Sequence, residues 1–470
     1  MKKIIFIFSI FAVFATVISA QNSTLLFGST YIPQSNSLNP AFYPDNNTFY
    51  ISLPSITQEI HIPVSYNDIF LKEGSSDERY MNAWDLAKLL KDDNNLFINT
   101  DIQHLGFGIR IRNLFVTFSS RTKLNIHFGV PTGVVSLFAD ELKGHESQRV
   151  TVSEPNLLQT TAYNEYALGG GYTLGNLTVG ARVKFLNGIC DFRTTQTDFS
   201  MQFDENSQLS EVLIKYYALS SGYQLFRKHT SVGDALKAVF TGKNMGMAFD
   251  LGAKFKWNFL EVSASVLDIG KGIHWKNDVV QIYPHENTAI TVDNYDFGHI
   301  AIDNWDTLQS VFQGTLDSIQ TNDSTMGGDY WSPIPTKINL GATVTLGKMC
   351  RAGLLFHGEW DKDISCFDKS GNPIDKTMFR HATSLVFGLN LANWVEVMAS
   401  LGVVKDGNKV DWFNPGLGVN FSFSKCIQFY ALANYVSSLR YTEAKSANIQ
   451  FGINLMFGGG FLAKAVNNDD

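Results

Sequence analysis

The chain has 470 residues, of which 44% are hydrophobic and 17% are charged, and its formal net charge is −7. This mild acidity is dispersed along the chain and argues against a nucleic acid as partner, because nucleic-acid-binding proteins usually carry a basic patch. The 4 cysteines are too few for a disulfide framework, so they are predicted to be isolated thiols, with a bridge between Cys350 and Cys366 as the alternative.

The N-terminus has the layout of a cleavable secretory signal peptide. Residues 1–3 form a positively charged end, residues 4–17 are an apolar run, and Ala20 is a small residue at the expected cleavage point. The run is shorter than the ~20 residues of a membrane-spanning helix. We therefore predict a signal peptide over residues 1–20 and export of the mature chain.

A polar and irregular segment follows from residue 21 to residue 47. Pro40 and Pro44 argue against a helix around Asn39-Pro40-Ala41, because proline lacks the backbone N–H and fixes φ. We predict that this segment is a plug or periplasmic segment lying against the mouth of a barrel.

The rest of the chain is dominated by segments in which apolar and polar residues alternate, the period of a β-strand. No apolar run beyond residue 20 is long enough for a transmembrane helix, so membrane insertion would require a closed β-barrel. A tilted strand crosses a bilayer with about ten residues. About 14 strands are predicted, at residues 48–56, 107–112, 114–120, 165–174, 177–187, 247–256, 260–269, 338–346, 349–359, 379–391, 394–405, 416–424, 427–436 and 448–457.

The connections alternate between short turns and long loops, and both termini fall on the short-turn side, as in bacterial outer-membrane barrels. Residues 122–163 are predicted to be mostly loop, with a short β piece at 124–130, and residues 60–66 are a candidate continuation of the first strand. Short helices are predicted in the long loops at 80–91, 231–240 and 303–319.

The predicted architecture is therefore all-β: a transmembrane antiparallel β-barrel with an N-terminal plug segment and short helices in extracellular loops. The predicted divisions are the signal peptide (1–20), the plug or periplasmic segment (21–47), the outer-membrane barrel (48–457) and a C-terminal periplasmic tail (458–470). Trp residues are expected in two interfacial girdles, Trp257 and Trp394 at short turns and Trp275, Trp360 and Trp412 near the long loops.

Charged residues on the polar faces of the strands are predicted to line the lumen. They indicate either a polar path or docking surface for the plug, or a hydrated, salt-bridged interior that conducts nothing. Three consecutive glycines within a strand, Gly169, Gly170 and Gly171, are a candidate kink. The predicted lumen-facing residues are Arg110, Arg112, Arg182, Lys184, Asp250, Lys254 and Lys256.

Patterns of known catalytic and metal sites are missing from the sequence. The 10 histidines are scattered without metal-ligand spacing, and there is neither a serine nucleophile elbow nor a CxxC pair. We predict no catalysis, no metal and no cofactor.

Several motifs resemble those of a known group of barrels. Asn39-Pro40-Ala41, after the signal peptide and before the first strand, resembles the N-terminal signature of outer-membrane barrels related to the long-chain fatty-acid transporter (FadL/PorV-like). Residues 33–42, 50–54, 267–270 and 334–342 look like marks of a branch of unknown function within that group. The Gly- and Ala-rich run that usually precedes the tripeptide in fatty-acid transporters is missing, which weakens the case for a fatty-acid substrate more than the case for the fold.

The resemblance implies a fourteen-stranded barrel in the outer membrane of a Gram-negative cell. Some members of the group move hydrophobic molecules through a plugged lumen and a lateral opening, and one kind is a partner of a secretion machine. We therefore expect passive uptake or transport of hydrophobic small molecules. The alternative is a non-transporting barrel that serves as an interaction partner of an outer-membrane secretion or assembly complex. The expected partners are outer-membrane lipid, a hydrophobic small-molecule ligand or such a protein complex.

Overall fold

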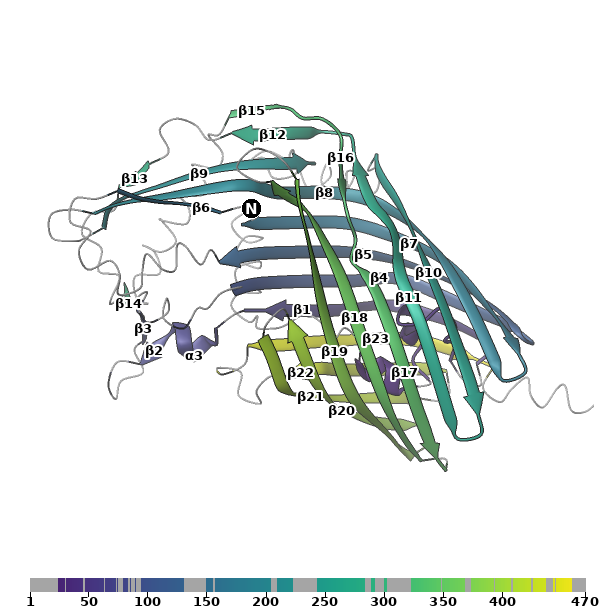
Figure 1. Cartoon of the computed structure of the whole chain (residues 1–470). Coiled ribbons are helices and arrows are strands. Elements are labelled where there is room, and N and C mark those ends of the chain that lie inside the picture. Colours follow the sequence, from purple (N-terminus) through teal and green to yellow (C-terminus); the bar gives the residue numbers. More distant parts are fainter. Residues whose placement is uncertain are drawn as a thin grey trace, which may run out of the picture.

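The computed structural model of the chain is a closed antiparallel β-barrel of 14 strands, which confirms the predicted fold class (Figure 1). The structure describes residues 24–29, 31–44, 47–62, 64–72, 74, 79–82, 85, 89, 94–130, 149–154, 157–203, 209–222, 243–283, 289–291, 300–301, 323–347, 349–367, 373–392, 394–406, 409–423, 426–436, 443 and 445–458. The predicted signal peptide and the predicted loop helices at 231–240 and 303–319 lie outside these residues.

The wall strands follow one another around the ring, and each of the 14 matches one predicted segment. They are β1 (Phe49–His61), β4 (Asn94–Ile111), β5 (Leu114–Val130), β7 (Leu158–Leu174), β8 (Leu177–Phe203), β10 (Asn244–Trp257), β11 (Leu260–Trp275), β17 (Thr336–Leu346), β18 (Cys350–Phe367), β19 (Pro373–Ala392), β20 (Val395–Asp406), β21 (Lys409–Phe423), β22 (Ile427–Val436) and β23 (Ser446–Phe457). The first strand pairs with both β4 and β23, so the ring leaves no open edge.

The side chains of β23 show how the wall is built. Ile449 and Phe451 are more than half exposed on the outer face, while Gln450 and Asn454 are buried on the inner face. A water-soluble barrel has the opposite arrangement, with apolar residues inside. The alternation therefore produces an apolar exterior around a polar lumen, the pattern of a membrane barrel.

Within the described residues, no helix is long and apolar enough to cross a membrane.

Several wall strands are longer than predicted. Residues 122–130 and 158–163, expected to be mostly loop, continue β5 and β7, and the two strands stay paired from Leu114↔Tyr172 to Phe128↔Leu158. The alternation of Leu124, Ile126 and Phe128 with polar residues was recognised as a short β piece, whereas residues 158–163 are mostly polar and show no such alternation. The predicted helix at 80–91 is wrong at its start, because Tyr80 and Met81 belong to β3 (Arg79–Met81), and most of its remainder lies outside the described residues.

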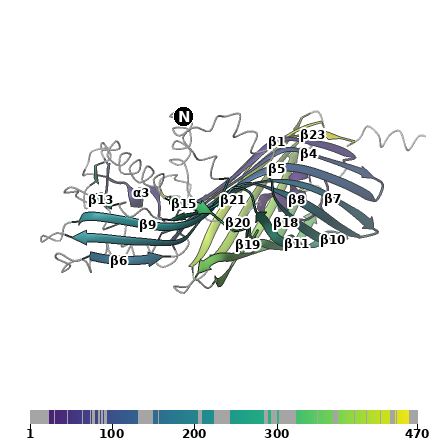
Figure 2. The same ribbon diagram turned by 90° about the horizontal axis from the view of Figure 1, so that it is seen from above.

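An arm of strands continues β8 beyond the barrel on the long-loop side (Figures 1 and 2). The far half of β8 pairs with β6 (Arg149–Glu154) and with β9 (Leu209–Ser221), and β9 pairs in turn with β12 (Val279–Tyr283) and β13 (Ala289–Thr291). The outermost strand is β15 (Asp323–Met326), which pairs with β12. The remaining short elements are β2 (Leu71–Lys72), β14 (Ile300–Ala301), β16 (Tyr330–Ser332) and the helix α3 (Tyr66–Ile69).

Two predictions about single residue types are decided by the fold. Trp257 and Trp394 are exposed near short turns, but Trp275 is fully buried, so its place in an outer girdle is wrong. The side chain of Trp412 lies outside the described part. Cys350 and Cys366 lie on the same strand, 16 residues apart and therefore roughly 50 Å from each other, and Cys350 is a free thiol.

Candidate functional site

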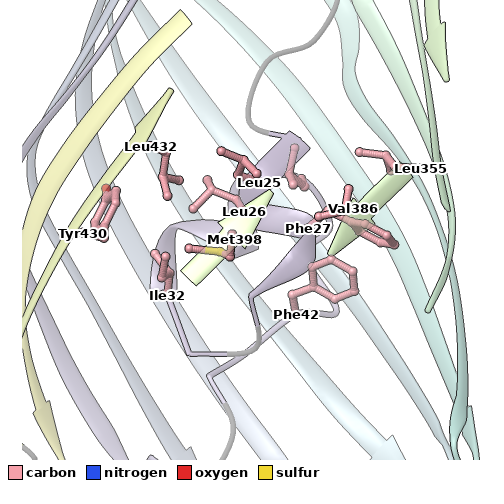
Figure 3. Packing of buried hydrophobic residues seen from close by; sticks show 11 residues of the cluster. Leu25, Leu26, Phe27, Ile32, Phe42, Leu355, Val386, Met398, Tyr430 and Leu432 are labelled. Carbon is pink, nitrogen blue, oxygen red and sulfur yellow. The ribbon is translucent and has the colours of Figure 1, made fainter. Parts of the chain in front are cut away.

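The N-terminal segment lies inside the barrel. It forms the helix α2 (Thr24–Gly28) and the 3-10 helix η1 (Pro33–Ser37), so the prediction of a wholly irregular segment is wrong. We call residues 24–44 the plug. Its apolar side chains and five wall residues form one buried cluster in the lumen (Figure 3), which consists of Leu25, Leu26, Phe27, Ile32, Leu38 and Phe42 with Leu355, Val386, Met398, Tyr430 and Leu432.

Polar contacts fix the first half of the plug to the wall. The backbone N–H of Leu25 donates to Oδ1 of Asn434 at 2.8 Å, and the Ser29 hydroxyl donates to Oε2 of Glu396 at 2.7 Å. The side-chain amides of Gln34 and Asn454 exchange two hydrogen bonds, of 2.9 and 3.0 Å. The plug is thus held by directional bonds as well as by apolar packing.

The tripeptide Asn39-Pro40-Ala41 is packed against glycines of the wall. Nδ2 of Asn39 donates to the carbonyl oxygens of Ala253 and Ala264 at 3.1 Å each. A Cβ atom at Gly180 would collide with the carbonyl of Pro40, and one at Gly252 would collide with the Asn39 side chain. The close approach therefore requires glycine at both wall positions.

A buried ionic cluster lies next to the plug. Nε of Arg182 donates to Oδ2 of Asp250 at 2.7 Å, and its Nη1 donates to the carbonyl and the side-chain oxygen of Asn36 at 3.1 and 2.9 Å. Nζ of Lys184 lies 3.0 Å from Oδ2 of Asp250 and 2.5 Å from Oδ1 of Asp268. Three of the predicted lumen residues therefore meet here.

Sequence reasoning missed Asp268, the fourth member of this cluster. Its backbone N–H donates to Oδ1 of Asp250 at 2.7 Å. The residue has a φ of 58°, and the register of β10 against β11 shifts between Met247 and Leu251. Such an irregularity breaks the alternation of faces, so the sequence did not show on which face of the wall the Asp268 side chain lies.

The other predicted lumen residues lie near the short-turn end. The guanidinium of Arg110 lies 4.3 Å from the centroid of the Tyr43 ring, and Nζ of Lys254 lies 3.8 Å from Oε2 of Glu261. Lys256 is exposed at the end of β10. Arg112 is exposed in the turn after β4 with a φ of 55°, so the prediction that it faces the lumen is wrong.

The three glycines at 169–171 show no register shift. They pair regularly with Thr117 to Phe115 of β5 and with Arg182 to Gly180 of β8. The shift in this strand pair lies instead between Ala162 and Tyr163. The predicted kink is therefore absent at the glycines, and Gly171 instead leaves room for the ring of Phe115.

Two cavities lie on opposite sides of the plug. We call the one on the long-loop side the outer chamber; it has a volume of about 210 Å³ and includes Ser37 and Leu38 of the plug in its lining. Its wall is rich in charge, with Glu59, Asp101, Arg121, Lys123, Glu165, Arg182, Lys184, Asp268, Lys337, Glu359 and Arg380.

The cavity near the short turns, which we call the inner chamber, has a volume of about 410 Å³. Tyr31 of the plug lines it, together with wall residues that include Lys256, Arg351, Trp394 and Glu396. Among the described residues, no group of three or more His, Cys, Asp or Glu side chains is arranged to hold a metal ion.

The wall of the outer chamber includes an interrupted seam. β11 pairs with β17 from Leu260 to Leu267 and with β16 from Ile273 to Trp275, and the described ladder has no pair between these two stretches. Facing the interruption are Pro333 and Pro335, which lack a backbone N–H. We call residues 268–272 and 333–335 the seam. Asp268 and residues 333–335 also line the outer chamber, so the chamber reaches the wall at this point.

Comparison with known proteins gives a family and several distant structures. Residues 40–434 match a family described as "Family of unknown function (DUF5723)". No curated protein matches the chain. The solved structures similar to it include the toluene transporter TbuX of Ralstonia pickettii, at 9% identity, covering 93% of this chain and 97% of that one, with a TM-score of 0.43.

Two other similar structures come from Pseudomonas putida. One is the toluene transporter TodX, at 10% identity, with 94% of this chain and 97% of that chain covered and a TM-score of 0.40. The second is an outer-membrane channel of the COG4313 type, at 8% identity, with 88% and 99% covered and a TM-score of 0.33.

Proposed function

For this chain, which belongs to the family of unknown function DUF5723, we propose transport of small molecules across the outer membrane through a lumen closed by the plug. The carrying observation is the plug between two cavities, the outer chamber of about 210 Å³ and the inner chamber of about 410 Å³. Open space on both sides of the plug is what a path gated by the plug requires. Movement of the plug joins the two chambers into one path.

The surface of the wall supports a location in the outer membrane. Large apolar side chains such as Ile109, Leu251 and Phe451 are exposed on the outer face, which is unfavourable in water. A closed barrel satisfies its backbone hydrogen bonds between strands and is the only strand architecture that spans a bilayer. Short turns at one end and long loops at the other match the periplasmic and extracellular ends of outer-membrane barrels.

The seam provides a second exit from the outer chamber. The seam combines a break in the backbone ladder with two prolines, so opening the seam would break few backbone hydrogen bonds. A hydrophobic molecule, the cargo expected from the sequence, leaves the chamber sideways into the lipid by this route. A cargo that passes beyond the plug enters the periplasm instead.

A reversible lock on the plug tests transport directly. A Cβ added at Gly28 would lie 3.7 Å from Cβ of Val386, the separation found in disulfides. The double variant Gly28→Cys and Val386→Cys, made without the native cysteines, is reconstituted in vesicles, and swelling with arabinose is measured. We expect flux after reduction and its loss after oxidation. A disulfide between the register partners Val262 and Ala342 is the control, because it joins two wall strands and leaves the plug free.

Equal swelling of vesicles with the reduced protein and vesicles without protein would overturn the transport proposal and favour the interaction-partner role. The seam is tested with a disulfide between the register partners His274 and Trp331. We expect this lock to slow toluene uptake by cells while arabinose flux in vesicles persists. Unchanged toluene uptake would remove the lateral exit from the proposal.

A further inference from the structure

Three carboxylates of the outer chamber each use one oxygen for the wall. Oε2 of Glu59 accepts a hydrogen bond from Nδ2 of Asn99 at 3.0 Å, and Oδ2 of Asp101 accepts one from Nη1 of Arg121 at 3.1 Å. Oε1 of Glu359 lies 3.8 Å from Nζ of Lys337 and 3.8 Å from Nη2 of Arg380. One oxygen of each carboxylate is thus assigned to a structural contact.

The second oxygen of each carboxylate is buried and has no hydrogen-bond partner among the described residues. These atoms are Oε1 of Glu59, Oδ1 of Asp101 and Oε2 of Glu359. Glu59 is 1% exposed and Glu359 is 5% exposed, yet both line the outer chamber. A buried carboxylate oxygen without a donor is unfavourable by about 1–3 kcal/mol or more. The arrangement therefore offers three acceptors to whatever occupies the chamber.

The three carboxylates lie near one another although they come from different parts of the wall. Glu59 is paired with Asn99, and Asp101 is two residues further along β4, so Glu59 and Asp101 are diagonal neighbours on the inner face. Such neighbours are about 7–8 Å apart. Glu359 belongs to β18, six strands around the ring from β1, and lines the same chamber as Glu59 and Asp101. Side chains from opposite walls therefore converge in this chamber.

We infer that the outer chamber binds a small organic ammonium, a hydrophobic cargo that carries one cationic group; its role as the transported molecule rests on the proposed function. An ammonium group has three N–H donors and no acceptor, so a single ammonium group can donate one hydrogen bond to each of three carboxylate oxygens. A hydroxyl group brings one donor together with acceptors, and a carboxylate ligand would bring only further acceptors. Arg121 binds the other oxygen of Asp101, and Lys337 and Arg380 lie near the other oxygen of Glu359. The other oxygen of Glu59 is bound by Asn99.

A matched series of four-carbon probes tests this assignment. The full mature protein in mild detergent is titrated calorimetrically with n-butylammonium, butyrate and 1-butanol, which share a chain and differ in the polar group. We expect n-butylammonium to bind at least about tenfold more tightly than the other two, since hydrogen bonds to charged groups contribute about 1.5–3 kcal/mol. Glu59→Gln and Glu359→Gln are each expected to weaken this binding about tenfold or more.

Asp68→Asn, which removes a carboxylate in the helix α3 outside the chamber, serves as the matched control and should bind as the parent does. Heat-modifiable migration in gels verifies that each variant is folded, and Asp101→Asn replaces any variant that is not. Equal binding of the three probes, tighter binding of butyrate, or unchanged binding by the Gln variants would overturn the ammonium assignment.

The two proposals fail separately. Arabinose flux controlled by the plug lock, without selective binding of n-butylammonium, overturns the ammonium site and leaves transport standing. Selective binding without any flux leaves the ammonium site standing and overturns transport.

Discussion

The two halves of the lumen are built in different ways. Around the plug, apolar side chains such as Leu26 and Met398 are fully buried and form a continuous cluster (Figure 3). In the outer chamber, charged residues line an open volume of about 210 Å³, and several of their polar atoms lack a partner among the described residues. The plug region is packed like the interior of a soluble domain, while the outer chamber has the character of a binding site. Substitutions should therefore affect stability in the first and ligand handling in the second.

The largest effect is expected where the two halves meet. Arg182→Ala removes the guanidinium that binds both Asp250 and Asn36, and leaves the fully buried Asp250 with only the Lys184 ammonium and the backbone N–H of Asp268. Removing one partner of a buried pair costs about 3–5 kcal/mol. The measurement is urea unfolding in detergent followed by tryptophan fluorescence. A loss below about 1 kcal/mol would mean that this cluster is hydrated rather than part of the packed half.

A smaller loss is expected inside the apolar cluster. Leu26→Ala deletes a side chain that is 0% exposed, and such truncations cost about 2–5 kcal/mol when the cavity cannot collapse. The expected loss is about 3 kcal/mol in the same urea assay. The lipid-facing variant Ile109→Ala is the control, because its side chain is 39% exposed and should tolerate truncation. Equal losses in the two variants would contradict the packed character of the plug region.

Crowding the tripeptide should release the plug at moderate cost. Gly252→Val places side-chain atoms where Asn39 lies, and overpacking of this kind costs about 1–3 kcal/mol. We expect the displaced plug to raise single-channel conductance in planar bilayers. Leu251→Val on the outward face of the same strand is the matched control. Unchanged conductance in the Gly252→Val variant would show that this contact does not hold the lumen closed.

The outer chamber should tolerate substitution best. Glu359→Gln keeps the shape of a side chain whose Oε2 has no partner among the described residues, and its ionic contacts are long, at 3.8 Å. Gln keeps an acceptor oxygen for both cations, so we expect a loss of stability of about 1 kcal/mol, the net contribution of a typical hydrogen bond, together with the loss of ammonium binding. A loss similar to that of Arg182→Ala would remove the contrast between the two halves.

The smallest effect is expected at Asp68, which lies in the helix α3 outside both halves of the lumen. Partial burial raises the pKa of the Asp68 carboxyl, but hydrogen bonds from Ser65 and the ammonium of Lys445 lower it by more. The pKa therefore lies below its ordinary value. A lowered pKa in the folded state stabilises above the unfolded pKa, and this contribution is lost as the pH falls through the folded value. The hydrogen-exchange protection factors of residues 65–70 should therefore fall below about pH 4. In Asp68→Asn this fall should disappear; its persistence would assign the effect to another group.

The candidate site was only partly visible in the sequence. Arg182, Lys184 and Asp250 were predicted to face the lumen because they alternate with apolar residues, and they meet in one cluster. Glu59 and Asp101 were not singled out because they lie outside the predicted strands at 48–56 and 107–112. Glu359 was missed although it is the last residue of the predicted strand at 349–359. Arg112 was misplaced because a turn follows β4 directly, and a turn residue belongs to neither face.

The sequence by itself determined the wall of the barrel. Alternation, short turns and strand count are local properties, since successive side chains point to opposite faces whatever the rest of the chain does. The contents of the lumen were decided only by the tertiary structure. The placement of Glu59 and Glu359 around one chamber depends on the register and closure of all strands around the ring, and no local pattern records it.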